Sequence, residues 1–241
     1  MDNKLKELLK KDYVILDGGM GTMLQAAGMK MGETPEMLNI TQPELLISIH
    51  EKYLNAGSDI IYANTFGGNR YKLECGHSVH ELVTAGIKNA RTACDNVKPE
   101  ALVALDVGPI GQLLEPTGTL SFEEAYEMYA EIVKAGEAAG ANLVVFETMT
   151  DLLDVKAAVL AAKENSSLPV MTTMTFEENM RTFTGCQISA FALTAAGLGV
   201  DALGVNCSLG PKELIPIVEE ISKWTTVPIV VKANAGLPDP V

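Results

Sequence analysis

The chain has 241 residues, with 18 Lys and Arg against 31 Asp and Glu, so its formal net charge is −13. This acidic surplus argues against nucleic acid and anionic lipid as partners, because phosphate is neutralised by clustered basic side chains. No apolar run approaches the ~20 residues of a membrane-spanning helix, and the charged start MDNKLKELLKK is unlike a signal peptide. Four cysteines are too few for a disulfide scaffold, which favours a cytoplasmic location.

Short runs rich in Val, Ile and Leu alternate with amphipathic stretches along the whole chain. No Pro- or Ser-rich linker interrupts them, so we treat residues 1–241 as one domain. Continuous apolar runs of this kind predict parallel strands that are buried on both faces. The seven predicted strands are Tyr13–Asp17, Asp59–Thr65, Ala101–Asp106, Asn142–Thr148, Pro169–Phe176, Ala202–Cys207 and Pro228–Asn234.

The stretches between these runs repeat apolar residues every three to four positions, which predicts helices with one buried face. Two of the helices are preceded by the sequence of a capping box, a hydroxyl residue followed three positions later by Glu. These pairs are Thr41 with Glu44 and Ser121 with Glu124. We expect each hydroxyl to lie at the start of its helix.

The alternation of strands and helices leaves two architectures, a doubly wound open sheet or a (β/α)8 barrel. Six predicted strands end in a residue that is ionisable, polar or able to ligate metal: Asp17, Asn64, Asp106, Glu147, Cys207 and Asn234. A barrel collects such groups from many strands at one mouth, whereas an open sheet gathers them at one switch point. We therefore predict an α/β fold of the (β/α)8 TIM-barrel type. Because only seven strands are counted, we expect a barrel truncated after strand seven, without its eighth strand and last helices.

Six motifs at the predicted strand ends carry a family resemblance. They are Asp17-Gly-Gly-Met-Gly-Thr22, Asn64-Thr-Phe-Gly67, Gly108-Pro109, Phe146-Glu-Thr148, Gly204-Val-Asn-Cys-Ser208 and Asn234-Ala-Gly236. In this order, over Val14 to Gly236, they resemble the homocysteine S-methyltransferase barrels. The resemblance is closest to the N-terminal homocysteine-binding module of cobalamin-dependent methionine synthase.

This resemblance implies a zinc ion held at the barrel mouth by three cysteine thiolates. The first matches Cys207, and the other two belong to a Gly-Gly-Cys-Cys-Gly motif that this sequence lacks. Asn234 is expected near the metal, where it occupies the fourth position until the substrate thiol displaces it. With one thiolate of three, we expect this polypeptide alone to bind zinc weakly and to be inactive.

The resemblance also implies a homocysteine site that is formed after three of the predicted strands. Its residues are Asp17, Gly18, Gly19, Met20, Asn64, Thr65 and Glu147. Glycines beside Asp17 allow backbone N–H groups to approach a carboxylate, and Glu147 is expected to bind the ammonium group. Asn64 and Thr65 either contact the substrate or orient the loops of the mouth. We interpret Asp106 as structural, because the matching position in the family is often not acidic.

The chemistry explains why a metal and a thiol ligand are needed. A free thiol has a pKa of ~8.5, so it is mostly protonated at neutral pH, although the thiolate is the nucleophile. Coordination to Zn²⁺ removes the proton, and three protein ligands leave one position open for the substrate. The resemblance implies transfer of a methyl group to homocysteine, giving methionine, with methylcobalamin on a corrinoid-carrying module or protein as the donor. S-methylmethionine and betaine serve other relatives.

Alternatives remain at this stage. One is a non-catalytic truncated barrel that acts as a scaffold for a corrinoid protein or partner subunit. Another is an unrelated barrel enzyme, for which Lys232 is the sole candidate catalytic lysine.

Three site assignments have an alternative. Cys207 is otherwise a buried core thiol, and Asp17 and Glu147 are otherwise carboxylates that hold loops at the barrel rim. Cys75 and Cys186, in loops after the second and fifth predicted strands, could ligate metal by accident.

Overall fold

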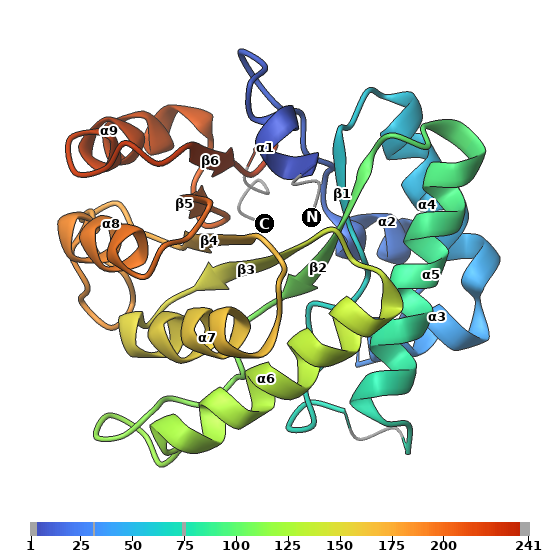
Figure 1. The fold of residues 1–241 in the computed structure, drawn as a ribbon, viewed down its shortest axis with the longest axis horizontal. Coiled ribbons are helices and arrows are strands. Elements are labelled where there is room, and N and C mark those ends of the chain that lie inside the picture. Colours follow the sequence, from blue (N-terminus) through green and yellow to red (C-terminus); the bar gives the residue numbers. More distant parts are fainter. Residues whose placement is uncertain (1–3, 31, 74–75, 237–241) are drawn as a thin grey trace.

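The computed structural model describes residues 4–30, 32–73 and 76–236, and its centre is a parallel β-sheet surrounded by helices (Figure 1). The strands within these residues are β1 (Ile60–Tyr62), β2 (Leu102–Val107), β3 (Leu143–Met149), β4 (Val170–Met174), β5 (Ala202–Asn206) and β6 (Ile229–Lys232). Each strand pairs in parallel with the next strand of the chain, in the order β1-β2-β3-β4-β5-β6. This order and the curl of the sheet confirm an α/β fold of barrel type, whereas eight strands and a truncation stay a prediction.

The helices lie mainly on the outer, convex side of the curled sheet (Figure 1). They are α1 (Lys4–Leu8), α2 (Met20–Ala26), the 3-10 helix η1 (Pro35–Met37), α3 (Leu38–Thr41), α4 (Pro43–Asn55), α5 (Val79–Val97), α6 (Phe122–Ala139), α7 (Leu152–Asn165), α8 (Ile188–Gly197) and α9 (Pro211–Ser222). From α4 to α9, each helix packs against the next one along the chain. No helix in the described part of the chain is long and apolar enough to cross a membrane.

Both faces of the sheet are apolar, which explains the continuous apolar runs in the sequence. One face packs against the helices in a large cluster that includes Val103, Leu105 and Phe146. Residues of the other face, such as Ala104 and Val145, form a second cluster inside the curl of the sheet. Leu5 of α1 belongs to this second cluster, so the N-terminal helix covers the interior from one end.

The predicted first strand, Tyr13–Asp17, is wrong as a strand. The segment forms one isolated parallel bridge, between Leu16 and Ile60. A longer ladder is prevented because the Ile15 N–H donates to the Asp59 side chain, at 3.1 Å, instead of to a strand. The Asp17 N–H still donates to the Ile60 carbonyl oxygen at 3.1 Å, and the Tyr62 N–H donates to Asp17 Oδ2, so Asp17 lies beside β1. The other six predicted strands are confirmed with small changes in their bounds.

The capping box of Ser121 and Glu124 is confirmed at the start of α6. The capping box of Thr41 and Glu44 is wrong, because Thr41 is the last residue of α3 and α4 begins at Pro43. In that helical position the Thr41 hydroxyl donates to the Met37 carbonyl oxygen at 3.1 Å, four residues back. Ser and Thr hydroxyls compete for such backbone acceptors inside helices.

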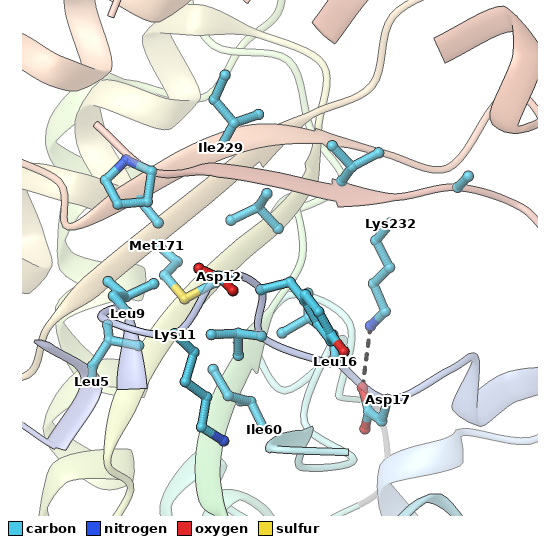
Figure 2. A pocket seen from close by; sticks show the side chains of 17 residues that line it. Leu5, Leu9, Lys11, Asp12, Leu16, Asp17, Ile60, Met171, Ile229 and Lys232 are labelled. Carbon is cyan, nitrogen blue, oxygen red and sulfur yellow. Dashed lines mark hydrogen bonds and ion pairs between the residues drawn. The ribbon is translucent and has the colours of Figure 1, made fainter. Parts of the chain in front are cut away.

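A cavity of about 650 Å³ lies between β6 and the extended segment that precedes α2 (Figure 2). Its lining includes Leu5, Leu16, Met171 and Val230. Within the described residues, β6 pairs with β5 on one side only, and its Val231 side chain is 47% exposed. The cavity is therefore an opening in the wall of the curled sheet, at the place where we predict a further strand.

Candidate functional site

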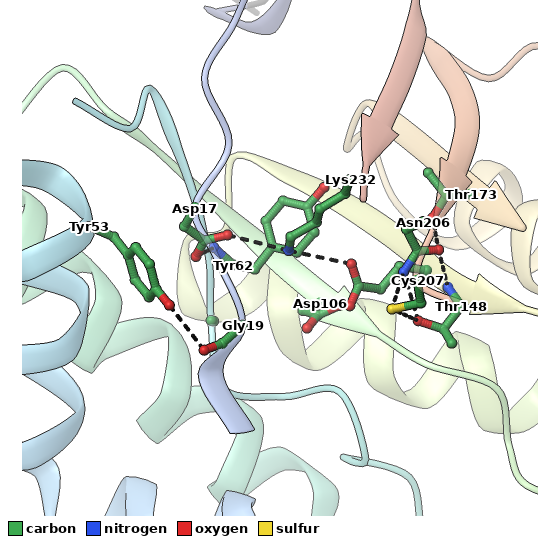
Figure 3. Close-up of polar contacts among 12 residues, drawn as sticks. Asp17, Gly19, Tyr53, Tyr62, Asp106, Thr148, Thr173, Asn206, Cys207 and Lys232 are labelled. Atoms are coloured by element: carbon green, nitrogen blue, oxygen red, sulfur yellow. Dashed lines mark hydrogen bonds and ion pairs between the residues drawn. The ribbon is translucent and has the colours of Figure 1, made fainter. Parts of the chain in front are cut away.

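A group of charged side chains lies inside the sheet near the carboxyl ends of the strands (Figure 3). We call it the charged cluster, and its members are Asp17, Tyr62, Asp106, Glu147 and Lys232. The Lys232 ammonium lies 3.4 Å from Asp17 Oδ1 and 3.5 Å from Glu147 Oε2. It also lies 3.6 Å from the centre of the Tyr62 ring, as in a cation–π contact. One largely buried lysine near the C-terminal end of the chain therefore joins a carboxylate near the N-terminus, Asp17, to one from the middle of the chain, Glu147.

Burial dominates the electrostatics of this cluster. It raises the pKa of Asp17 to about 6, although the Lys232 charge and the Tyr62 N–H, 2.7 Å from Oδ2, act in the opposite direction. Burial likewise raises the pKa of Asp106 well above its ordinary value, and the nearby Glu147 adds to this effect. Burial alone would lower the pKa of Lys232, but the carboxylates around it raise that pKa above the ordinary value. Lys232 is therefore a cation at neutral pH.

A second group of side chains, the thiol cluster, consists of Thr148, Thr173, Asn206 and Cys207. Its centre is the buried amide of Asn206, whose oxygen accepts from the Thr148 N–H and the Thr173 hydroxyl, both at 2.8 Å. The amide nitrogen donates to Thr148 Oγ1 at 2.8 Å and to Cys207 Sγ at 3.3 Å. Asn206 thus fixes the position of the thiol relative to the end of β3.

The backbone of the thiol cluster is strained. Thr148, Cys207 and Ser208 have φ angles of 60°, 59° and 61°, in the left-handed region that favours glycine. A β-branched threonine there is a clear outlier, and each such residue costs about 1–3 kcal/mol. Strain of this kind is concentrated at functional sites, where the surrounding structure maintains it. The turn carries the Cys207 thiol away from β5 and toward Thr148.

The thiol of Cys207 is half-buried, and burial raises its pKa, an effect that the contact with Thr148 partly offsets. Glu147 raises the same pKa and Lys232 lowers it, so the thiol cluster lies within electrostatic range of the charged cluster. Figure 3 shows both clusters at the same end of the sheet. The two clusters therefore belong to one site.

The described residues do not complete a zinc site by themselves. Within residues 4–30, 32–73 and 76–236, no three His, Cys, Asp or Glu side chains are arranged to hold a metal ion. Cys94 is buried in α5 and Cys186 precedes α8, whereas Cys75 lies outside the described residues. Cys207 is the one thiol that we place in the candidate site. No catalytic step through a metal follows from these residues.

The predicted ligand Asn234 lies close to the thiol cluster in the fold. Its N–H donates to the carbonyl oxygen of Leu209 at 3.2 Å, and the Cys207 N–H donates to the Lys232 carbonyl oxygen at 3.1 Å. The ends of β5 and β6 are thereby joined. The segment that contains Asn234 runs beside the turn that contains Cys207.

The turn after Asp17 is glycine-rich for a reason that the sequence did not reveal. A Cβ on Gly18 would lie 2.8 Å from the ring of Tyr53, and the Tyr53 hydroxyl donates to the Gly19 carbonyl oxygen at 3.0 Å. Gly18 therefore leaves room for the Tyr53 ring of α4, which a side chain at this position would displace. Met20 is the first residue of α2, which places the backbone of this turn beside the charged cluster.

Asn64 and Thr65 are buried, and their polar groups are engaged within the protein. Asn64 Nδ2 donates to the Pro35 carbonyl oxygen at 2.8 Å and to Asn39 Oδ1 at 3.0 Å. The Thr65 hydroxyl donates to the carbonyl oxygen of Asp106 at 2.7 Å. These contacts favour the alternative that both residues orient the loops of the mouth.

Sequence reasoning missed four members of the site, namely Tyr62, Thr148, Thr173 and Asn206. Asn206 stands beside Cys207 in a motif that we had attributed to the metal alone. Lys232 was considered only for an unrelated enzyme. The sequence contains a sign of its importance, because Lys232 is an ionisable residue that directly follows the apolar run 228–231.

The sequence and the fold match one class of proteins. The family model described as homocysteine S-methyltransferase matches residues 14–240, so the chain belongs to the homocysteine S-methyltransferase family. Two relatives are the methionine synthases of Mycobacterium leprae (strain TN) and Mycobacterium tuberculosis (strain ATCC 25618 / H37Rv). Each is 32% identical over 254 residues, covering 98% of this chain and 21% of the relative. The chain thus spans about a fifth of the length of these relatives.

Solved structures agree with this result. The apo form of the homocysteine methyltransferase MmuM from Escherichia coli is 25% identical with a TM-score of 0.80, covering 95% of this chain and 84% of that one. Its metallated form has a TM-score of 0.87 at 24% identity, with 97% and 88% covered, which supports the fold alone.

Proposed function

We propose that this chain is a homocysteine-binding barrel that transfers a methyl group to the homocysteine thiol and so gives methionine. The observation that carries the proposal is the pairing of the two clusters in one site. The strained, hydrogen-bonded thiol of Cys207 supplies a metal ligand, and the charged cluster supplies groups that recognise an amino acid. A thiol-containing amino acid has a partner for each of its functional groups in such a site.

The amino-acid end of homocysteine is assigned to the charged side of the site. The turn Asp17–Met20 and the carboxylate of Glu147 receive it, and the Gly18 and Gly19 backbone lies beside Asp17. Asp17 is fixed by the Tyr62 N–H and by Lys232, which reduces the conformational freedom that binding must remove. Asn64 and Thr65 orient the loops without direct contact.

Fewer residues support the proposal of a metal site, because the described residues supply one thiolate, that of Cys207. In it, Cys207 and Asn234 form part of a zinc site, and two further thiolates come from outside the described residues. Zinc, when bound, keeps the substrate thiol deprotonated at neutral pH. The proposed donor is methylcobalamin, on a separate corrinoid-carrying module or protein.

The second candidate function is a non-catalytic barrel that acts as a scaffold for a corrinoid protein or partner subunit. The incomplete set of metal ligands in the described residues favours it. An enzyme that uses Lys232 as a nucleophile is not supported by the geometry. Nucleophilic lysines need a depressed pKa, whereas the carboxylates here raise that of Lys232.

The experiment compares the zinc content of this polypeptide with that of a version extended through an adjacent pair of cysteines after an eighth strand. Near-stoichiometric zinc in the extended version only, lost on Cys207→Ala and retained on Cys186→Ala, supports the proposal. Methyl transfer to homocysteine is then measured in the extended version.

The other results are equally informative. Stoichiometric zinc in the short polypeptide contradicts the ligand assignment. Absence of zinc from both versions contradicts thiol activation by a metal and favours the scaffold function.

A further inference from the structure

Asp106 differs from the other two carboxylates of the charged cluster. Asp17 and Glu147 both pair with Lys232. The Asp106 side chain is buried, and its Oδ1 atom has no hydrogen-bond partner. A buried polar atom without a partner costs free energy, typically about 1–3 kcal/mol and more for a charged group. The fold therefore keeps a destabilising buried oxygen, Asp106 Oδ1, to which no group of the described residues donates a hydrogen bond.

The position of Asp106 is well defined. Its N–H and its carbonyl oxygen both bond the hydroxyl of Thr65, at 3.1 and 2.7 Å, so the backbone at the end of β2 is fixed. β2 lies between β1, which carries Tyr62, and β3, which carries Glu147. Figure 3 shows Asp106 between Asp17 and Cys207. The carboxyl group therefore lies between the two clusters.

The charges of the cluster are unbalanced. With all groups ionised, three carboxylates face one ammonium, which leaves two negative charges in a largely buried site. Among the charged groups, Glu147, Lys232, Asp17 and Glu36 act on Asp106 most strongly, and Lys232 is the cation among these four. Lys232 already engages Asp17 and Glu147. A proton on Asp106 or a bound cation reduces the imbalance, and Asp106 Oδ1 is an acceptor without a partner that a bound cation can use.

We propose that Asp106 is a substrate-binding residue whose free carboxyl oxygen accepts a hydrogen bond from the α-ammonium group of the amino-acid substrate. This inference rests on the proposed function and replaces our interpretation of Asp106 as structural. The ligand class is a primary ammonium ion whose molecule also carries a thiol that reaches Cys207. Lys232 keeps Asp17 and Glu147 in place while the substrate ammonium occupies the side of the cluster that faces Asp106.

The test measures binding directly, without a methyl donor. Homocysteine and 4-mercaptobutanoate, which lacks the α-amino group, are each titrated by calorimetry into the zinc-loaded extended version, as wild type and as Asp106→Asn. Loss of a hydrogen bond between two charged groups weakens binding about tenfold or more. We therefore expect Asp106→Asn to lower the affinity for homocysteine by at least about tenfold and to leave the affinity for 4-mercaptobutanoate unchanged.

Asp154→Asn is the matched control. Asp154 is also a buried carboxyl whose pKa burial raises, to about 7, but it lies on α7 and accepts from the Tyr129 hydroxyl at 2.8 Å. This variant is expected to bind both ligands as the wild type does. The melting temperature of Asp106→Asn is expected to equal or exceed that of the wild type, because the substitution removes a desolvated acid; a structural residue would lower it.

The outcomes separate the two hypotheses. If the wild type does not bind homocysteine, the proposed function is wrong and this inference fails with it. If the wild type binds homocysteine and Asp106→Asn binds it equally well, the inference alone is wrong. Equal weakening of both ligands, or a marked fall in melting temperature, would assign Asp106 a structural role.

Discussion

The charged cluster and the thiol cluster lie at the same end of the sheet but are stabilised in different ways. The charged cluster depends on Coulomb attraction to one long, flexible lysine, Lys232, whose contacts with Asp17 and Glu147 are 3.4 and 3.5 Å long. The thiol cluster depends on short neutral hydrogen bonds around Asn206 and on a strained backbone at Thr148 and Cys207.

This difference separates two requirements of the site. A metal ligand, the role that we propose for Cys207, has to be held in one geometry, and the four hydrogen bonds of the Asn206 side chain hold this turn in place before any ligand binds. The charged cluster, which we propose receives the amino-acid end of the substrate, instead keeps an acceptor without a partner, Asp106 Oδ1, and a flexible lysine that can adjust to a ligand. The thiol side is therefore preorganised and the charged side is adaptable.

The largest expected effect comes from breaking the thiol cluster with Asn206→Ala. The substitution leaves Thr173 Oγ1, Thr148 Oγ1 and the Thr148 N–H without their partner in a buried place, so we expect a loss of about 2–4 kcal/mol in the free energy of unfolding. Urea denaturation measures it. Asn89→Ala, which removes one bond to the Asn39 carbonyl oxygen, is the control and is expected to cost about 1 kcal/mol. Equal losses would mean that the cluster is not specially stabilised.

The contribution of the charged cluster can be measured through the pH dependence of stability. Burial raises the pKa of Asp17 to about 6 from 3.8, so the folded chain holds this proton more tightly than the unfolded chain. The free energy of unfolding should therefore fall as pH rises from about 4 to 6, by about 1–3 kcal/mol from this group. We expect Asp17→Asn to remove that part of the slope in urea denaturation at several pH values.

The control for this slope comes from the other cluster. Burial raises the pKa of Cys207, so its thiol stays protonated throughout the window from pH 4 to 6. Cys207→Ser is expected to keep the wild-type slope. A slope that Cys207→Ser changes and Asp17→Asn preserves would reverse our assignment of the adaptable and preorganised sides.

The smallest effect concerns the strained turn. Ser208 is exposed and has a φ of 61°, a conformation that glycine adopts without a steric penalty. Ser208→Gly is expected to raise the free energy of unfolding by about 0.5–1 kcal/mol, as measured by thermal denaturation. Ser222→Gly, at the end of α9, lacks this benefit and should be neutral or destabilising by up to about 1 kcal/mol. A loss of stability in Ser208→Gly would show that the turn is not strained.

The sequence predicted the architecture well because parallel strands that are buried on both faces leave a strong pattern. The apolar runs around β2 and β5 were located to within a residue or two. The run Tyr13–Asp17 had the same composition, but its ladder is interrupted by Asp59, a tertiary contact that no local pattern encodes. The capping box at Thr41 failed for a similar reason, since its hydroxyl can either accept from the N–H of residue 44 or donate to a carbonyl oxygen, and it donates to that of Met37.

Within the site, the motif residues could be predicted and their partners could not. Asp17, Glu147 and Cys207 all follow apolar runs, so the barrel pattern places them at one mouth. The contacts that fix them involve Tyr62 from β1, Thr173 from β4 and Lys232 from β6. These depend on which strands are neighbours and on the length of each side chain, which one sequence does not reveal.

The ion pair between Asp17 and Lys232 joins residues that are 215 positions apart in the chain. Closing so long a segment has a large entropic cost, so this contact gains its partners only after the strands between them have assembled. The charged cluster is therefore among the last parts of the molecule to form. On the function that we propose, a nascent or partly folded chain would carry the Cys207 turn and its helices before it could bind an amino acid, so premature binding of substrate is disfavoured by topology alone.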